Sequence, residues 1–266
     1  MSNYNYINLK KKYDKRGYVV VKNLIEKQKI NLLKKKLAEL FKTCYEKHKI
    51  YLLSDVTLDW DCKIFNNKIF SLRKKYPEIF SKVYNMIKNN NLLINILNDK
   101  KIISHAANLI STKKHNLWNG EFMLRMDAPK DKRNNLGWHQ EVYYYTLQTI
   151  NGENGIVAWV ALSKLINETN GGVQVCPSSH LEGMVSSVKK INSSKSIRKN
   201  QLISITRSVD KKILKKYKPE TINANIGDVI FMNMKTFHRS GKNISNYFRL
   251  STVSRLFDMN SKDWPL

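Results

Sequence analysis

The stretch ETINANIGDVIFMN, residues 220–233, contains two short runs of strand-forming residues separated by a glycine. β-Branched and aromatic residues favour strands, and glycine favours the turns between them. The same pattern of short strand-forming runs separated by turn residues recurs from about residue 120 to the C-terminus. We therefore expect strands at 121–127, 138–145, 155–162, 171–176, 201–207, 220–226, 228–233 and 247–257. Eight short strands at this spacing predict an all-β sandwich or barrel, with a jelly roll as the simplest arrangement.

The N-terminal part of the chain has a different pattern. Residues 17–22, GYVVVK, predict a short strand, and residues 27–46 carry apolar side chains at helical spacing within a Lys-rich segment. A second helical pattern covers 76–99. The polar stretch 186–200 is rich in Ser and Lys and predicts a mobile surface loop.

We therefore expect one domain over residues 1–266, with a mainly helical elaboration at 1–117 and a jelly-roll core at 118–266. The chain has 266 residues, which is enough to bury a substantial core. The three cysteines, Cys44, Cys62 and Cys176, form no CxxC pair, and the N-terminus has no apolar signal region, so a reducing cytoplasm is expected. No apolar stretch has the length of a membrane span.

The formal net charge of +26 is the most unusual feature of the composition. Clustered lysines bind nucleic acid through its phosphates. Here the lysines are scattered along the whole chain beside abundant Asn and Ile, a composition that an AT-rich genome also produces. We therefore disfavour a nucleic-acid partner and expect a small-molecule substrate, with an anionic one somewhat favoured.

One motif with metal-binding potential is Trp138-His139-Gln140-Glu141. On a strand, residues two positions apart point to the same face, so His139 and Glu141 can reach one metal ion while Gln140 points away. A His-x-Glu motif is short and also arises by chance, and a surface-exposed pair on an edge strand is the alternative.

A second motif is Phe237-His238-Arg239-Ser240-Gly241. If a hairpin turn is centred on residues 242–245, antiparallel pairing places Arg249 directly opposite His238. Arginine suits a carboxylate because it donates two parallel hydrogen bonds. Two imidazoles and one carboxylate leave metal positions open, as non-haem Fe(II) oxygenases require.

Three other residues are candidates for the substrate pocket. Strand alternation places Tyr143 and Tyr145 on the face of His139 and Glu141, although ordinary aromatic packing explains them equally well. Arg125 alternates with apolar neighbours on its predicted strand, so it faces either the pocket or the solvent.

These motifs closely resemble the phytanoyl-CoA dioxygenase family of Fe(II)- and 2-oxoglutarate-dependent oxygenases. The resemblance rests on the two metal motifs, on residues 170–180 (NGGVQVCPSSH), and on Gly227-Asp228-Val229 before His238, in the family's order. The opening residues 17–21 also look like the start of that family. Most members carry Asp where this chain has Glu141.

The resemblance implies a double-stranded β-helix, cupin-like and flanked by N-terminal helices. It implies that His139, Glu141 and His238 hold Fe(II), that Arg249 and Ser240 bind the distal carboxylate of 2-oxoglutarate, and that Trp159 lines the same pocket. With O2, such a site hydroxylates a small-molecule metabolite. Two alternatives remain open at this point: a non-catalytic polyanion-binding protein on the same scaffold, and a cupin-like metal enzyme of another reaction type, such as an isomerase.

Overall fold

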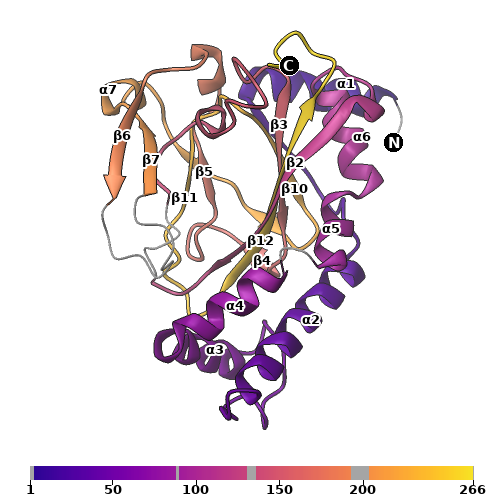
Figure 1. Cartoon of the computed structure of the whole chain (residues 1–266). Coiled ribbons are helices and arrows are strands. Elements are labelled where there is room, and N and C mark those ends of the chain that lie inside the picture. Colours follow the sequence, from indigo (N-terminus) through magenta and orange to yellow (C-terminus); the bar gives the residue numbers. More distant parts are fainter. Residues whose placement is uncertain (1–2, 88–89, 131–135, 193–203, 266) are drawn as a thin grey trace.

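A five-stranded antiparallel sheet forms the centre of the computed structural model, which describes residues 3–87, 90–130, 136–192 and 204–265 (Figure 1). The strand order is β1-β10-β3-β12-β2. In that order the strands are β1 (Tyr18–Val21), β10 (Val229–Asn233), β3 (Gly155–Ala161), β12 (Arg249–Asp258) and β2 (Leu117–Asp127). The longest pairing joins β12 to β2 and is interrupted by a register shift between Arg255 and Leu256.

A smaller sheet of order β11-β5-β8 faces the large sheet, and two-stranded ribbons complete the β structure (Figure 1). The strands of the small sheet are β11 (His238–Ser240), β5 (Val173–Val175) and β8 (Glu220–Thr221). The ribbons pair β4 (Leu165–Ile166) with β9 (Ala224–Asn225), and β6 (Ser187–Asn192) with β7 (Ser204–Val209). Two antiparallel sheets with an apolar layer between them, together with flanking helices, confirm the predicted jelly-roll fold.

Strand β3 shows how the sequence specifies these layers. All seven of its residues are buried. Ala158 and Val160 pack in the core under the helices, whereas Val157, Trp159 and Ala161 pack in the core between the two sheets. A strand covered on both faces needs a continuous apolar run, and this explains why β3 lacks the polar alternation of a half-exposed strand.

Helices cover the face of the large sheet that points away from the small sheet (Figure 1). They are α1 (Asn3–Arg16), α2 (Lys27–Glu46), α3 (Lys63–Lys75), α4 (Pro77–Ile87), α5 (Asn91–Leu97) and α6 (Lys100–Leu109). A short α7 (Lys211–Leu214) follows β7. Helix α2 matches the predicted bounds, and its apolar stripe packs into the core through Ile30, Leu33, Leu37 and Phe41. Among the described residues, no helix is both long and apolar enough to cross a membrane.

The predicted helix over 76–99 is in fact two helices. Helix α4 ends at Ile87, and α5 begins after Asn90, whose side-chain oxygen accepts a hydrogen bond from the backbone N–H of Leu92 at 2.9 Å. This is an N-cap, and Asn is among the residues preferred there because its side chain satisfies a backbone donor that a helix start leaves unpaired. The apolar pattern on both sides was recognisable, but the cap between them was missed.

Two predicted strands and one predicted loop are also corrected. Residues 138–145 form no strand: His139 makes an isolated bridge, and Glu141–Tyr144 is a 3-10 helix. Within the predicted loop 186–200, residues 187–192 form strand β6, which pairs with β7, and residues 193–200 lie outside the described part. The predicted strand 220–226 consists of β8 and β9, which pair with different strands.

Candidate metal centre

His139 and His238 are held together by their own backbones. The N–H of His139 donates to the carbonyl of His238, and the N–H of His238 donates to the carbonyl of His139, both at 3.0 Å. This reciprocal pair is one rung of an antiparallel ladder, and it places the ring centroids 4.2 Å apart. Two residues far apart in the sequence therefore present their imidazoles at one point.

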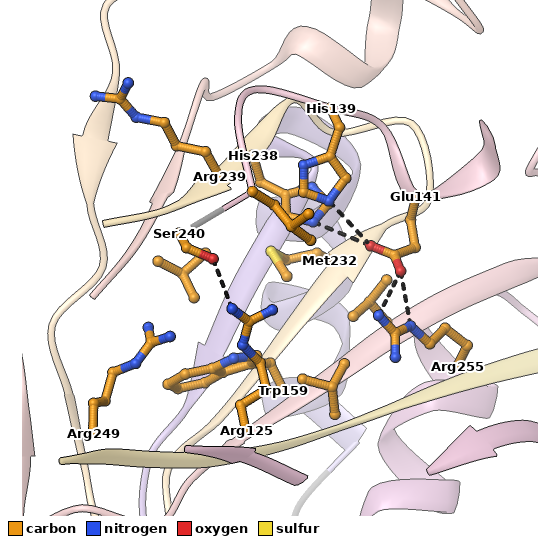
Figure 2. A pocket seen from close by; sticks show the side chains of 14 residues that line it. Arg125, His139, Glu141, Trp159, Met232, His238, Arg239, Ser240, Arg249 and Arg255 are labelled. Atoms are coloured by element: carbon orange, nitrogen blue, oxygen red, sulfur yellow. Dashed lines mark hydrogen bonds and ion pairs between the residues drawn. The ribbon is translucent and has the colours of Figure 1, made fainter. Parts of the chain in front are cut away.

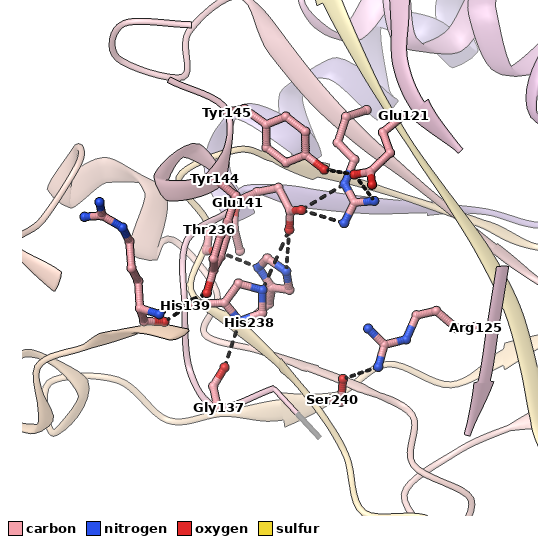
Figure 3. A network of polar contacts seen from close by, with 12 residues as sticks. Glu121, Arg125, Gly137, His139, Glu141, Tyr144, Tyr145, Thr236, His238 and Ser240 are labelled. Carbon is pink, nitrogen blue, oxygen red and sulfur yellow. Dashed lines mark hydrogen bonds and ion pairs between the residues drawn. The ribbon is translucent and has the colours of Figure 1, made fainter. Parts of the chain in front are cut away.

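Both imidazoles are oriented by backbone carbonyls. The Nδ1 atom of His139 lies 2.7 Å from the carbonyl oxygen of Gly137, and that of His238 lies 2.9 Å from the carbonyl oxygen of Thr236 (Figure 3). Because a carbonyl only accepts, each Nδ1 carries the proton and each Nε2 keeps its lone pair. This is the tautomer in which a histidine binds a metal through Nε2.

Glu141 completes the group. Its Oε2 atom lies 3.2 Å from Nε2 of His238 and 3.7 Å from Nε2 of His139 (Figure 2). All three side chains are buried, and their candidate ligand atoms lie within 4.8 Å of one another. Two imidazole nitrogens and one carboxylate oxygen form a donor set that suits Fe(II) and leaves positions open.

The loop between the two ligands is fixed by Gln140, which is fully buried. Its amide nitrogen donates to the carbonyls of Gly183 and Lys235, both at 2.7 Å, and its amide oxygen accepts from the N–H of Val185 at 3.0 Å. The predicted direction of Gln140, away from the metal, agrees with these contacts. The reason is different from the predicted one, because the segment after His139 turns as a 3-10 helix and not as a strand.

Arg255 holds the outer oxygen of Glu141. Its Nε and one terminal nitrogen donate to Oε1 at 2.8 and 2.6 Å, and both side chains are buried (Figure 2). Burial alone would raise the pKa of Glu141, but the charge of Arg255 holds that pKa well below its usual range. The carboxylate is therefore ionised, as a metal ligand must be.

A second charged group lies at the other end of the same cavity. Arg249 is 1% exposed and contacts the carboxylate of Asp127 and the carbonyl of Gly171, while its Nε has no hydrogen-bond partner. Arg125 donates to the hydroxyl of Ser240 at 3.1 Å (Figure 3). It also lies 3.4 Å from a carboxylate oxygen of Asp127. Burial would raise the pKa of Asp127, but Arg125 and Arg249 outweigh it and lower this pKa to about 2.

The cavity between these two charged groups has a volume of about 40 Å³, and its walls are polar and apolar in about equal parts (Figure 2). Trp159 lines it, with the guanidinium carbon of Arg249 5.8 Å from the indole centroid. The other apolar wall residues are Leu136, Val157, Val173, Met232 and Val253. Arg125, Ser240 and Arg249 also lie in the wall, so the structure brings together the residues expected for a metal and for an anionic group.

The predicted hairpin between His238 and Arg249 is wrong. Strand β11 pairs with β5, where His238 is opposite Val175, and β12 pairs with β2, where Arg249 is opposite Asp127. The segment between them crosses from one sheet to the other, and the side chain of Asn243 anchors it by donating to the carbonyls of Asp127 and Tyr247. His238 and Arg249 still line one cavity because the two sheets face each other across it.

The tyrosine prediction is also corrected. Tyr143 donates to the carbonyl of Val185, and Tyr145 donates to Glu121; neither lines the cavity in the described part of the chain. Tyr144 instead packs its ring against His139, with centroids 5.8 Å apart. A 3-10 helix repeats every three residues, so the alternation assumed for a strand did not apply.

Sequence reasoning missed Arg255, Asp127 and Tyr144. The signal for Arg255 was present, since it shares the β12 face with Arg249 at an even spacing. Asp127 shares a face with Arg125 in the same way. Nothing local indicated Tyr144, because its placement depends on the 3-10 turn.

The chain belongs to the phytanoyl-CoA dioxygenase family: the model of that family, described as phytanoyl-CoA dioxygenase (PhyH), matches residues 13–251. A comparison with curated protein sequences gave no match. The sequence resemblance that was recognised from the separated motifs is thus confirmed over most of the chain.

Solved structures with the same fold are distant in sequence. The epimerase SnoN, in complex with Fe3+, alpha ketoglutarate and nogalamycin RO, is 15% identical with a TM-score of 0.59, over 97% of this chain and 85% of that one. EctD from S. alaskensis, in its apoform, is 15% identical with a TM-score of 0.59, over 99% and 80%. The carbocyclase SnoK from nogalamycin biosynthesis is 15% identical with a TM-score of 0.55, over 97% and 84%.

Proposed function

We propose that this chain is an Fe(II)- and 2-oxoglutarate-dependent oxygenase that hydroxylates a small molecule. The observation that carries the proposal is the convergence of His139, Glu141 and His238 beside a buried arginine in one cavity. Family membership supports it, and so does SnoN, whose structure is described as a complex with Fe3+ and alpha ketoglutarate.

In this proposal the two Nε2 atoms and Oε2 of Glu141 hold the metal. The backbone carbonyls on Nδ1 fix the tautomer of each histidine, and burial lowers the pKa of His139. A neutral imidazole is the form that binds a metal, so the protein prepares the ligands before the metal arrives.

Arg249 and Ser240 hold the distal carboxylate of 2-oxoglutarate, and Trp159 forms the wall beside it. Arg249 already contacts one carboxylate, that of Asp127, but its Nε remains without a partner. Arg125 also contacts Asp127 and donates to Ser240, so it lies at the same end of the cavity as Arg249. We therefore propose that Arg125 assists Arg249 in binding the co-substrate.

Fe(II) with 2-oxoglutarate and O2 supplies, when bound, the oxidation of a substrate C–H bond. The protein's own contribution is to orient the reacting groups and to exclude water. Apolar side chains on β3, β5, β10 and β12 line the cavity, and a low-dielectric wall strengthens the interactions of its charged groups. The net charge of +26 favours an anionic metabolite as substrate.

Another reaction on the same cofactors is the second candidate. The fold neighbours include a protein described as an epimerase and one described as a carbocyclase. A fold does not determine the reaction, so hydroxylation rests on the family and not on these neighbours. Product analysis separates the candidates, because hydroxylation adds one oxygen atom from O2 to the substrate, whereas epimerisation leaves its mass unchanged.

The test of the proposed function is succinate release from 2-oxoglutarate with the Fe(II)-loaded protein, screened over small anionic metabolites. His139→Ala and His238→Ala are expected to abolish 2-oxoglutarate turnover. Full turnover by either variant would refute the assignment. Arg239→Met is the matched control: Arg239 also lines the cavity, but its guanidinium points away from the ligand group and contacts Trp138 and Gln174 (Figure 2).

A further inference from the structure

Glu141 uses its two carboxylate oxygens for different partners. Oε2 faces the two histidine Nε2 atoms, and Oε1 accepts two hydrogen bonds from Arg255 at 2.8 and 2.6 Å. A carboxylate bound to a metal through both oxygens would occupy two positions, whereas one bound through a single oxygen occupies one. The contact between Arg255 and Oε1 therefore bears on how many positions stay open.

The position of Arg255 is itself strongly determined. It lies on β12 opposite Val157 of β3, is buried, and has its guanidinium carbon 5.5 Å from the ring centroid of Tyr145. A terminal nitrogen of Arg255 lies 3.6 Å from a carboxylate oxygen of Glu121. The same carboxylate accepts a hydrogen bond from the hydroxyl of Tyr145 (Figure 3). Arg255 is thus held between one buried carboxylate and one half-exposed carboxylate, with a tyrosine ring alongside.

The length of Glu141 is necessary for this arrangement. The carboxylate must reach a point near both histidines and also the guanidinium on β12. An aspartate at the same backbone position would be shorter by one methylene, so it could not keep both contacts without a backbone shift. This offers a physical reason for the Glu at position 141.

We propose that Arg255 is a positioning residue that restricts Glu141 to single-oxygen coordination and so keeps one metal position open for O2. The inference rests on the proposed function. In an octahedral site, three protein atoms and a chelating 2-oxoglutarate leave one position. A second oxygen from Glu141 would fill that position.

The experiment counts the exchangeable waters on Mn(II) by water-proton relaxation, in the protein loaded with Mn(II) and 2-oxoglutarate. Wild type is expected to keep one exchangeable water, and Arg255→Met is expected to keep none while it binds Mn(II) at least as tightly. Arg255→Lys retains a charged donor to Oε1 and is expected to restore the water. Glu121→Gln, which removes the other carboxylate near Arg255, is expected to match wild type.

Two results would overturn the inference. One is an unchanged water count in folded Arg255→Met, and the other is a loss of Mn(II) affinity with the water retained, which marks a purely structural role. If Arg255→Met does not fold, a crystal structure of the Mn(II)-loaded wild type decides: Oε2 alone on the metal supports the inference, and both oxygens on the metal contradict it. Failure of wild type to bind Mn(II) would instead refute the proposed function.

Discussion

The N–H and carbonyl groups of His139 and His238 bond reciprocally at 3.0 Å, so the two imidazoles are paired by backbone geometry before any metal binds. This pairing joins the loop after residue 136 to the start of strand β11. The imidazoles themselves add little to it, because the contacts that hold the loop come from backbone groups and from Gln140.

His139→Ala is therefore expected to leave the fold intact and to remove metal binding. The melting temperature of the metal-free variant should stay within a few degrees of wild type, and Co(II) affinity should fall by more than the roughly 10–100-fold that loss of a supporting group costs. Calorimetry and Co(II) absorption measure the two quantities. A variant that binds Co(II) as tightly as wild type would show that His139 is not a ligand.

Arg249→Lys is expected to separate co-substrate binding from metal binding. Lysine keeps the charge but loses the planar fork that matches a carboxylate. Because a charged hydrogen bond contributes about 1.5–3 kcal/mol, the affinity for 2-oxoglutarate should fall roughly 10–100-fold while Co(II) affinity is unchanged. Titration of the Co(II)-loaded protein with 2-oxoglutarate measures the affinity for the co-substrate. Arg239→Lys, on the facing sheet, is the control. Equal losses in both variants would argue against a specific role for Arg249.

Asp127→Asn is expected to change the response of the protein to acid. Because folding lowers the pKa of Asp127 to about 2, the ionised carboxylate stabilises the folded state at every pH above its unfolded pKa of about 4. This contribution, about 2 kcal/mol, is lost as the pH falls from about 4 to about 2. Urea unfolding of the two proteins across this range should show a smaller loss for the variant. Parallel curves would contradict the placement of Asp127 between two arginines.

The same variant is expected to bind 2-oxoglutarate more tightly. Asparagine keeps a hydrogen-bond acceptor near Arg249 but removes the negative charge that opposes an incoming carboxylate. Titration of the Co(II)-loaded protein should show the increase, and added salt should have little effect on it because the site is buried. Weaker binding would mean that Asp127 orients the arginines and that this role outweighs repulsion.

Gly171→Ala is expected to disturb the Arg249 site from the backbone side. Gly171 has φ +88°, its carbonyl accepts from Arg249, and an added Cβ would lie 2.9 Å from the carbonyl oxygen of Gly241. Gly183→Ala is the matched control, since Gly183 has φ +72° but open space around its Cβ position. Both variants carry the backbone strain of roughly 1–3 kcal/mol, and only Gly171→Ala should also weaken 2-oxoglutarate binding. Equal affinity of both variants for 2-oxoglutarate would contradict the proposal that the Gly171 backbone positions Arg249.

Local sequence patterns predicted the layers of this fold well. Strand β3 is buried on both faces and therefore has a continuous apolar run, and α2 is buried on one side and therefore has apolar residues at helical spacing. Both patterns lie within a single element, so they can be read from a short stretch of sequence. The candidate metal ligands were also recognisable, because residue types and their order carry the chemistry. The predicted strand at 138–145 failed because Gln140 and the backbone of Met234 draw the chain into a 3-10 turn, and those contacts are with distant residues.

The partners of the site's charges could not be read from the sequence. Arg249 lies opposite Asp127, and Arg255 reaches Glu141, only because β12 is placed between β2 and β3 in the large sheet. A strand order is a property of the whole chain, and the assumed hairpin gave the wrong neighbour for Arg249. Arg249 does line the cavity, but the predicted reason was wrong: it lies near His238 because the two sheets face each other, and not because β11 and β12 pair as a hairpin.

The central claim is that His139, Glu141 and His238 hold an iron that 2-oxoglutarate chelates beside Arg249. Anaerobic titration of the Fe(II)-loaded protein with 2-oxoglutarate, followed by visible absorption, tests it most directly. A metal-to-ligand charge-transfer band that saturates at one equivalent in wild type, and is absent in His238→Ala, is the predicted result. Iron that stays bound without any such band, or an unchanged band in His238→Ala, would contradict the account.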